Sequence, residues 1–358
     1  MILLSSLISE YQDTLLKNYH DQLLPSHLRA LGAMRNCRTD DSLFMMAQCQ
    51  QCDHQTYHPH SCGHRMCPHC QHHEGQQWLA RQQKKLLPVD YFMVTFTLPA
   101  QLRTLAWHNQ RLIYAMLFSV GWETLSAFGL NDKKLQGNMG ATGILHTHSR
   151  ALDFHPHVHF IVPAGAVDSC HRLWRKKEGH YLFKEKHLAK VFRAKWFDAM
   201  RKNELSVNEN IPIKWIVNCQ HVGHGEKALT YLGKYLYRGV LPEKNIIRHL
   251  NGNVTFRYTD NNKITQTRTL PGADFLWLLL KHVLPRGFRR ARDYGFLHAN
   301  CKRSIQFIQY ILRCVIPPGE VPEVVRPTFC CSKCGSAMKM MATRIPRNKT
   351  PWPLLIGT

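Results

Sequence analysis

The stretch DFHPHVHFIVP, residues 153–163, alternates histidines with apolar side chains. Side chains two residues apart in a β-strand share a face and lie about 6–7 Å from each other. His157 and His159 would therefore share one face, while Val158 and Phe160 would lie on the other. The alternation predicts a strand that packs one face into a core and lines the other with imidazoles.

Two neutral imidazoles on one strand face can bind a single divalent cation, and imidazole is the commonest metal ligand in proteins. The alternative is that the histidines are only polar residues of a half-exposed strand, which three alternating histidines make less favoured. An ion needs more than two ligands, and GILHTHS (143–149) reads as the preceding strand. Hairpin pairing would bring His146 or His148 beside the pair, and we favour His146.

The rest of the chain predicts an α+β fold built on an antiparallel sheet. Further strands are predicted at 89–99 and 211–220, and a hairpin at 253–270 with its turn at Asp260, Asn261 and Asn262. Helices are predicted at the N-terminus and at about 74–88, 102–128, 185–203, 226–238, 273–283 and 300–314.

The charge balance favours a polyanionic partner. The 358 residues carry 47 Lys and Arg against 24 Asp and Glu, a net charge of +23. Nucleic acid is the commonest partner of such a chain, and a basic surface without a specific ligand is the alternative.

We expect no membrane segment and a reducing compartment. The apolar run FLWLLL (275–280) is far shorter than the roughly 20 residues that a spanning helix needs. The first 25 residues lack the basic start of a signal peptide and read as an amphipathic helix. Without an export signal, thirteen cysteines indicate metal binding or burial rather than disulfides.

The stretch EKALTYLGKYLYRGV, from Glu226, predicts a helix with two tyrosines on one face. Tyr231 and Tyr235 are four residues apart and therefore stack one turn apart. Lys234 and Arg238 flank them and would place positive charge beside a bound phosphate. An aromatic core stripe is the alternative, and taken alone it is the better interpretation. A separate apolar ridge consists of Ala228, Leu232 and Leu236.

The histidines and the tyrosines together predict more than either motif alone. A phenol, with an ordinary pKa of about 10, is a weak nucleophile at neutral pH. It can attack a phosphodiester when a nearby cation polarises the phosphate. The resulting phosphotyrosine keeps the energy of the broken linkage, so a 3′-hydroxyl can reverse the step without ATP. A second tyrosine one turn away would allow a second strand transfer.

Two pairs of cysteines predict a structural zinc site. Cys49-x2-Cys52 and Cys67-x2-Cys70 are separated by fourteen residues, close to the spacing that holds one tetrahedral zinc ion. A second zinc site is possible with the remaining ligands Cys37, Cys62 and His64, with His72 also nearby.

Two further motifs lie near the C-terminus. CCSKCG supplies Cys331 and Cys334, half of a zinc site that is either completed from elsewhere or vestigial. RGFRRARD interleaves arginines with Phe288 and is followed by Tyr294, a composition that suits the backbone and bases of single-stranded DNA; a solvated basic face is the alternative. The arginines are Arg286, Arg289, Arg290 and Arg292.

These motifs, in this order over about residues 20–340, resemble the insertion-sequence-91 family of two-tyrosine rolling-circle transposases in the HUH endonuclease superfamily. HPHVHFIVP resembles the family's metal strand, which implies His157 and His159 as ligands. YLGKYLYRG resembles its tyrosine helix, which implies Tyr231 and Tyr235 as nucleophiles. The cysteine-rich segment resembles its zinc-binding domain, with one departure: Met66 stands where family members carry a histidine before the fifth cysteine.

The resemblance implies an enzyme that nicks and rejoins single-stranded DNA at transposon ends and target through a 5′-phosphotyrosine, with Mg²⁺ or Mn²⁺ for catalysis and Zn²⁺ for structure. The expected modules are a zinc-binding segment at 1–87, an HUH catalytic domain with helices on one face at 88–316, and a basic cysteine-containing tail at 317–358. A bacterial cytoplasmic, nucleoid-associated location is expected, and oligomerisation is left open. The alternatives are a replication initiator or relaxase, and a zinc-dependent DNA-binding protein without catalysis.

Overall fold

The computed structural model describes residues 2–70, 72–207, 210–237, 240–260, 262–314 and 328–346, without the side chains of Lys234, Tyr235 and Tyr237. The chain forms two compact units that are interleaved along the sequence. The first consists of Met1–Glu74, Tyr237–Val283 and Pro322–Thr358, and the second of Gly75–Leu236 and Leu284–Val321. The expected modules are consecutive, whereas each unit gathers distant segments; the module boundaries stay a prediction.

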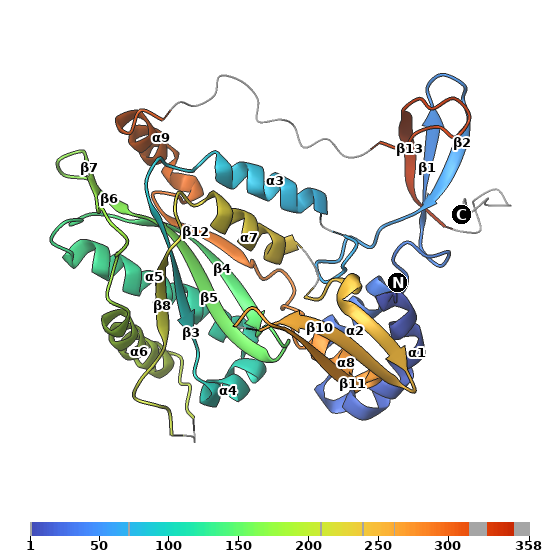
Figure 1. The fold of residues 1–358 in the computed structure, drawn as a ribbon, viewed down its shortest axis with the longest axis horizontal. Helices are drawn as coiled ribbons and strands as arrows, with labels where there is room; N and C mark the ends of the chain where they lie inside the picture. The colour runs from blue at the N-terminus through green and yellow to red at the C-terminus, as the bar shows by residue number, and fades with distance from the viewer. Residues whose placement is uncertain are drawn as a thin grey trace. The chain divides into compact units, whose positions relative to one another are not determined.

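A five-stranded antiparallel sheet organises the second unit (Figure 1). Its order is β12-β4-β5-β3-β8, so the two histidine-bearing strands are central neighbours. The predicted hairpin is confirmed, with His146 directly opposite His157. The strands are β3 (Tyr91–Thr97), β4 (Gly140–His148), β5 (Phe154–Pro163), β8 (Val217–His221) and β12 (Ala291–Gly295).

One face of this sheet packs against helices and forms the main core. Val158 and Phe160 are fully buried there, as the alternation predicts, and α5 contributes Phe118 and Leu117 to the same cluster. Phe192 and Trp196 of α6 complete it from the β8 side. The helices are α4 (Arg103–His108), α5 (Gln110–Asn131) and α6 (Glu185–Lys202).

The opposite face carries the histidines, and α3 (His72–Gln83) and α7 (Glu226–Tyr237) lie on it. Thr142 of β4 points to this face and donates a hydrogen bond to Asp293 of β12, which also accepts from Gln82 of α3. A Cβ on Gly225, just before α7, would lie 2.9 Å from the Tyr91 ring, which is on the same face. The start of α7 is thus anchored on the histidine side of the sheet.

The remaining elements of the second unit lie around this framework. Gln309 of α9 donates a hydrogen bond to the Lys84 carbonyl, which holds α9 beside the end of α3. These elements are the hairpin β6 (Gly165–Asp168) and β7 (Leu173–Lys176), α9 (Lys302–Ile311), and the 3-10 turns Ala100–Leu102 and Ala299–Cys301.

The first unit combines a helical layer with a three-stranded sheet. The Tyr19 hydroxyl donates to Asp274, which ties α1 to α8, and the predicted hairpin is confirmed, with Asp260 accepting from the amide of Asn262. The sheet order is β11-β10-β9. The elements are α1 (Leu4–Tyr19), α2 (Pro25–Arg35), α8 (Gly272–Leu280), β9 (Ile246–Leu250), β10 (Asn253–Thr259), β11 (Thr265–Pro271), and the 3-10 turns His20–Gln22 and Glu243–Asn245.

The first unit also contains a ribbon made from both ends of the chain. β1 (Phe44–Cys49) and β2 (Gln55–Pro59) form a hairpin, and β13 (Met338–Ile345) pairs with the outer side of β1. The sheet order is β13-β1-β2 (Figure 1).

Two elements differ from the sequence prediction for local reasons. The helix expected at 102–128 is broken at Asn109, whose φ of −122° and ψ of 39° lie outside the helical region. The Leu105 carbonyl accepts from both the backbone amide and the side-chain amide of Asn109, which caps the first segment. The strand expected from Ile211 begins only at Val217. Pro212 lacks a donor for a sheet ladder, and its carbonyl instead accepts from the Trp215 indole.

Helix α5 is long and apolar enough to cross a membrane by length and composition alone, and it is the one described helix that is. Of its most apolar stretch, 56% is buried within the protein. A core helix passes the same test, and the contacts of α5 with the sheet are those of a core helix.

Gly295, at the end of β12, is a position where we predict a strong effect on stability. Its φ is +57°, and a Cβ there would lie 1.8 Å from the Met139 carbonyl oxygen. Gly295→Ala should lower the free energy of unfolding by roughly 3 kcal/mol, because a backbone atom cannot move aside as a flexible side chain can. Gly287 has φ +73° and open space around it, so Gly287→Ala should cost only about 1 kcal/mol. Equal losses in urea denaturation of the two variants would contradict the prediction.

Candidate active site and metal centres

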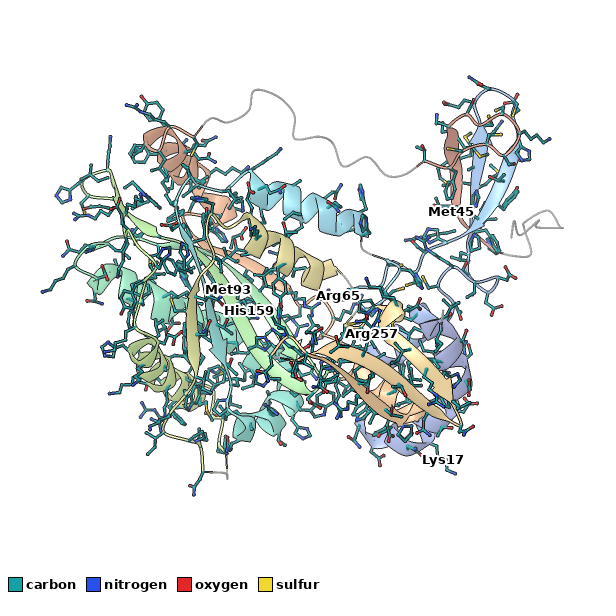
Figure 2. The ribbon with its side chains drawn as sticks, viewed as in Figure 1. Lys17, Met45, Arg65, Met93, His159 and Arg257 are labelled. Carbon is teal, nitrogen blue, oxygen red and sulfur yellow. The ribbon has the colours of Figure 1, made fainter. Side chains whose placement is uncertain are left out.

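Three imidazoles from two neighbouring strands converge on one point of the sheet. One nitrogen each of His146, His157 and His159 lies within 4.8 Å of the others. The ring centroids of His146 and His159 are 4.4 Å apart, and those of His157 and His159 are 4.8 Å apart. Figure 2 labels His159 on the central strand β5, next to Met93 on β3. The structure thus brings together the predicted pair and the favoured third histidine.

Hydrogen bonds orient two of these rings. Nδ1 of His157 lies 2.7 Å from the His155 carbonyl oxygen, which can only accept, so Nδ1 donates and Nε2 keeps its lone pair. Nδ1 of His159 lies 2.7 Å from the Thr95 hydroxyl, which can accept in the same way. A metal-binding histidine commonly donates its second ring nitrogen to an oxygen in this manner. Sequence reasoning did not single out Thr95, although the register of β3 places it opposite His159.

Burial keeps these rings neutral. It lowers the pKa of His157 to about 3, and it lowers the pKa values of His146 and His159 well below their ordinary range. Neighbouring imidazoles lower the pKa values of His146 and His159 further, since each disfavours a charge on the next. Neutral rings offer the lone pairs that a cation needs.

The donor set fits a divalent cation with open coordination positions. Three imidazoles leave room for oxygens of a substrate, as in catalytic rather than structural metal sites. Of the two expected cations, Mn²⁺ accepts nitrogen ligands more readily than Mg²⁺, which prefers oxygens. His155 lies outside the set, because its Nδ1 contacts the Arg103 guanidinium at 2.8 Å.

Helix α7 presents Tyr231 with 45% of its surface exposed, while Leu232 and Leu236 are buried. The apolar ridge predicted for this helix is therefore confirmed as its buried side. The side chains of Tyr235 and Lys234, and all of Arg238, lie outside the described residues. Gly233 packs closely on α3, since a Cβ there would lie 3.3 Å from the Trp78 ring.

The cysteines form two four-membered sets, and their grouping corrects the sequence prediction. Cys49, Cys52, Cys67 and Cys70 do not form one set. Cys67 and Cys70 join Cys37 and Cys62, whereas Cys49 and Cys52 join Cys331 and Cys334. Spacing in the sequence favours a site made of the two neighbouring C-x2-C pairs, Cys49 with Cys52 and Cys67 with Cys70. The ribbon instead places the C-terminal pair, Cys331 and Cys334, beside Cys49 and Cys52. Together with the histidines, these are the three sets of candidate metal ligands among the described residues.

The first cysteine set is compact and largely buried. Sγ of Cys37 lies 3.5 Å from that of Cys67 and 3.6 Å from that of Cys70, and Sγ of Cys62 lies 3.6 Å from Cys70. His64 is not a member, which corrects its candidacy as a ligand: its Nδ1 instead accepts from the Met66 amide. Four thiolates at these separations fit a closed structural zinc site.

The arginine block does not form one exposed basic surface. Arg286 and Arg289 are exposed, whereas Arg290 is buried and donates from Nε to the Leu145 carbonyl. The guanidinium of Arg292 lies 4.4 Å from the ring centroid of Phe118.

The aromatic residues of this block correct the expectation that they stack on bases. Phe288 belongs to the buried core, and Tyr294 stacks on Trp122 with ring centroids 5.1 Å apart. The Phe288 ring is buried, and the half-buried Tyr294 ring is stacked on Trp122, so neither ring is exposed as a platform for a base.

Comparisons with known proteins cover both the histidine sheet and the cysteine-rich segment. A family model described as "Putative transposase" matches residues 140–304, and one described as "Transposase zinc-binding domain" matches residues 7–98. The first range contains the three histidines and α7, and the second contains the first cysteine set. No solved structure matches the chain.

Two curated relatives align with most of the chain. "Putative transposase y4qJ" of Sinorhizobium fredii (strain NBRC 101917 / NGR234) is 30% identical over 302 residues, 78% of this chain and 76% of the relative. "Transposase for insertion sequence element IS801" of Pseudomonas savastanoi pv. phaseolicola is 28% identical over 328 residues, 80% of this chain and 76% of the relative. With both family models in the expected order, the chain belongs to the insertion-sequence-91 family of transposases.

Proposed function

We propose that this transposase nicks and rejoins single-stranded DNA through a covalent 5′-phosphotyrosine, in rolling-circle transposition. The observation that carries the proposal is the convergence of three neutral imidazoles on the same sheet face on which α7 starts. Metal ligands and a tyrosine helix on one face are what phosphodiester cleavage by a phenol requires.

His146, His157 and His159 would hold the catalytic Mg²⁺ or Mn²⁺, which supplies Lewis-acid polarisation of a phosphate oxygen when bound. Thr95 and the His155 carbonyl fix the orientations of the His159 and His157 rings, so two of the three donors are preorganised and lose little entropy on binding. Because the rings lie on a sheet rather than on a loop, the phosphate would be bound at a fixed place relative to α7.

Tyr231 and Tyr235 are the proposed nucleophiles. In each step the phenolic oxygen forms a bond to phosphorus, the bond from phosphorus to the 3′-oxygen breaks, and that oxygen leaves as a 3′-hydroxyl with the proton of the phenol. The number of phosphodiester bonds is conserved, so the reverse reaction with a new 3′-hydroxyl joins strands without ATP. Two tyrosines one helical turn apart would serve two ends in succession.

The charge of the chain supports a DNA partner. A net charge of +23 favours binding to a phosphate backbone. Such binding weakens at higher salt, because the counterions that the protein displaces from the DNA then gain less entropy on release. Arg286 and Arg289 are the members of the arginine block whose guanidinium groups are free to reach solvent-side phosphates. We propose that the protein acts on the nucleoid in the cytoplasm.

Covalent capture of DNA is the direct test. Incubating the protein with labelled single-stranded DNA from an element end and Mn²⁺ should give an adduct that survives boiling in detergent. Peptide mass spectrometry should locate the nucleotide on Tyr231 or Tyr235. Tyr231→Phe combined with Tyr235→Phe should abolish the adduct, because a phenyl ring has no oxygen to attack with.

Tyr310 offers a matched control, since it is 83% exposed on α9 of the same unit. Tyr310→Phe should leave adduct formation unchanged. An adduct on Tyr237, or one that persists in the double variant, would show that the nucleophiles are misassigned. Equal DNA binding by the wild-type and double-variant proteins would confirm that the loss concerns chemistry.

A further inference from the structure

The second cysteine set joins two segments that lie at opposite ends of the sequence. Sγ of Cys49 is 3.4 Å from that of Cys334, and Sγ of Cys52 is 3.6 Å from that of Cys331. These partners are 285 and 279 residues apart in the chain. The two C-terminal cysteines lie outside both segments that match the transposase family models.

Two turns place the pair Cys49 and Cys52 next to the pair Cys331 and Cys334. The first knuckle is the β1–β2 turn, where the Cys49 amide donates to the His54 carbonyl. The second precedes β13, where the Gly335 amide donates to the Cys331 carbonyl and Gly335 has φ +76°. Cys49 lies opposite Met338, the first residue of β13, so both knuckles are at the same end of the ribbon.

The four sulfurs have the spacing of a single tetrahedral metal site. All four lie within 4.8 Å of one another. Zinc–sulfur bonds of 2.3 Å in a tetrahedron place the sulfurs about 3.8 Å apart. A disulfide would need about 2.05 Å between sulfurs, so the observed separations are not those of disulfides.

The ribbon has too little apolar core to be stable by burial alone. Its buried cluster consists of Ala47, Cys49, Cys331 and Met338, with Phe329 partly buried. The ring of Phe329 stacks on His58 at 3.9 Å between centroids, and Phe44, at the start of β1, is buried outside this cluster. Small domains of this kind usually depend on a metal or disulfides.

We propose that Cys49, Cys52, Cys331 and Cys334 bind one Zn²⁺, separate from the zinc of the first cysteine set, and that this ion holds the C-terminal segment 328–346 in the ribbon. The two cysteines of CCSKCG that form half of a zinc site are completed by Cys49 and Cys52 near the N-terminus. Four sulfur donors around one point favour Zn²⁺ over Mg²⁺ or Ca²⁺. Folding of the ribbon and metal binding are then one event.

Zinc stoichiometry of the full chain tests the proposal. The measurements are made in the His157→Ala background, so that the histidine site does not contribute. Native mass spectrometry and elemental analysis should find two zinc ions per chain, and one after Cys331→Ser combined with Cys334→Ser. Cys330→Ser is the matched control, because Cys330 is exposed and adjacent but outside the set, and it should keep two.

Two further measurements distinguish the loss of zinc coordination from a non-specific loss of stability. Cys334→His should retain the second zinc, since imidazole is also a zinc ligand. In the double serine variant, the amides of β13 should exchange hydrogen at least about tenfold faster, while those of α8 in the same unit are unchanged. Retention of two zinc ions by the double serine variant, iron in place of zinc, or an unaltered exchange rate in β13 would each overturn the proposal.

Discussion

Replacing His159 with alanine should reduce strand cleavage by at least about 10³-fold. The His159 ring lies 4.4 Å from the His146 ring between centroids and completes a set of three donors. Its loss leaves two imidazoles and should lower the affinity of the site for the cation. Polarisation by a bound cation contributes several kcal/mol to such a reaction, and each 1.36 kcal/mol changes the rate tenfold. The measurement is single-turnover cleavage of labelled single-stranded DNA over a range of Mn²⁺ concentrations.

His155 provides the matched control on the same strand face. It lies next to His157 but outside the three-histidine set, and the bond it offers to His157 comes from its backbone carbonyl. His155→Ala therefore keeps that bond and should retain cleavage within about threefold. DNA binding in EDTA should be equal in the wild-type, His155→Ala and His159→Ala proteins. If His159→Ala cleaved as fast as the wild type at every Mn²⁺ concentration, the histidines would not be the metal ligands.

The sheet around the site could be predicted because its pattern is local. Alternation of histidine with apolar residues in β5 defines which face is buried, and the short connection to β4 defines the partner strand. The same pattern could not reveal β12 as the neighbour of β4, because that pairing joins residues about 150 positions apart and Ala291–Gly295 has no strong alternation. Long-range pairing is decided by packing rather than by local sequence.

The cysteine sites show what could not be predicted from local sequence. Sequence spacing correctly identifies C-x2-C knuckles, yet it does not say which knuckles meet. Proximity in sequence favours Cys52 with Cys67, whereas the ribbon brings Cys52 to Cys331. The prediction that the arginine block is exposed is wrong at Arg290 for a related reason. A charged side chain usually lies at the surface, but Arg290 is buried and donates a hydrogen bond to the Leu145 backbone carbonyl. In each case a specific tertiary contact overrides a compositional tendency.

Phe160 should be the residue of the histidine strand whose truncation costs most stability. It is fully buried on the face opposite His159, and its ring occupies a slot between Gly121 of α5 and Gly143 of β4. Phe160→Ala should lower the free energy of unfolding by about 3–5 kcal/mol, because it removes apolar contacts and leaves a cavity. Phe307 of α9 is 36% exposed, and Phe307→Ala should cost less than about 1 kcal/mol. Urea denaturation followed by tryptophan fluorescence measures both.

Combining substitutions at Gly143 and Phe160 tests this packing more sharply, because their effects on the free energy of unfolding should not be additive. A Cβ on Gly143 would lie 2.8 Å from Cε1 of Phe160, so Gly143→Ala alone should be destabilising. In the Phe160→Ala protein the same methyl group enters the cavity and meets no ring. The two substitutions together should therefore cost at least about 1 kcal/mol less than the sum of the single costs, as contacting residues are coupled. Strict additivity would mean that Phe160 does not fill this slot, and that the histidine face is supported by some other packing of β5.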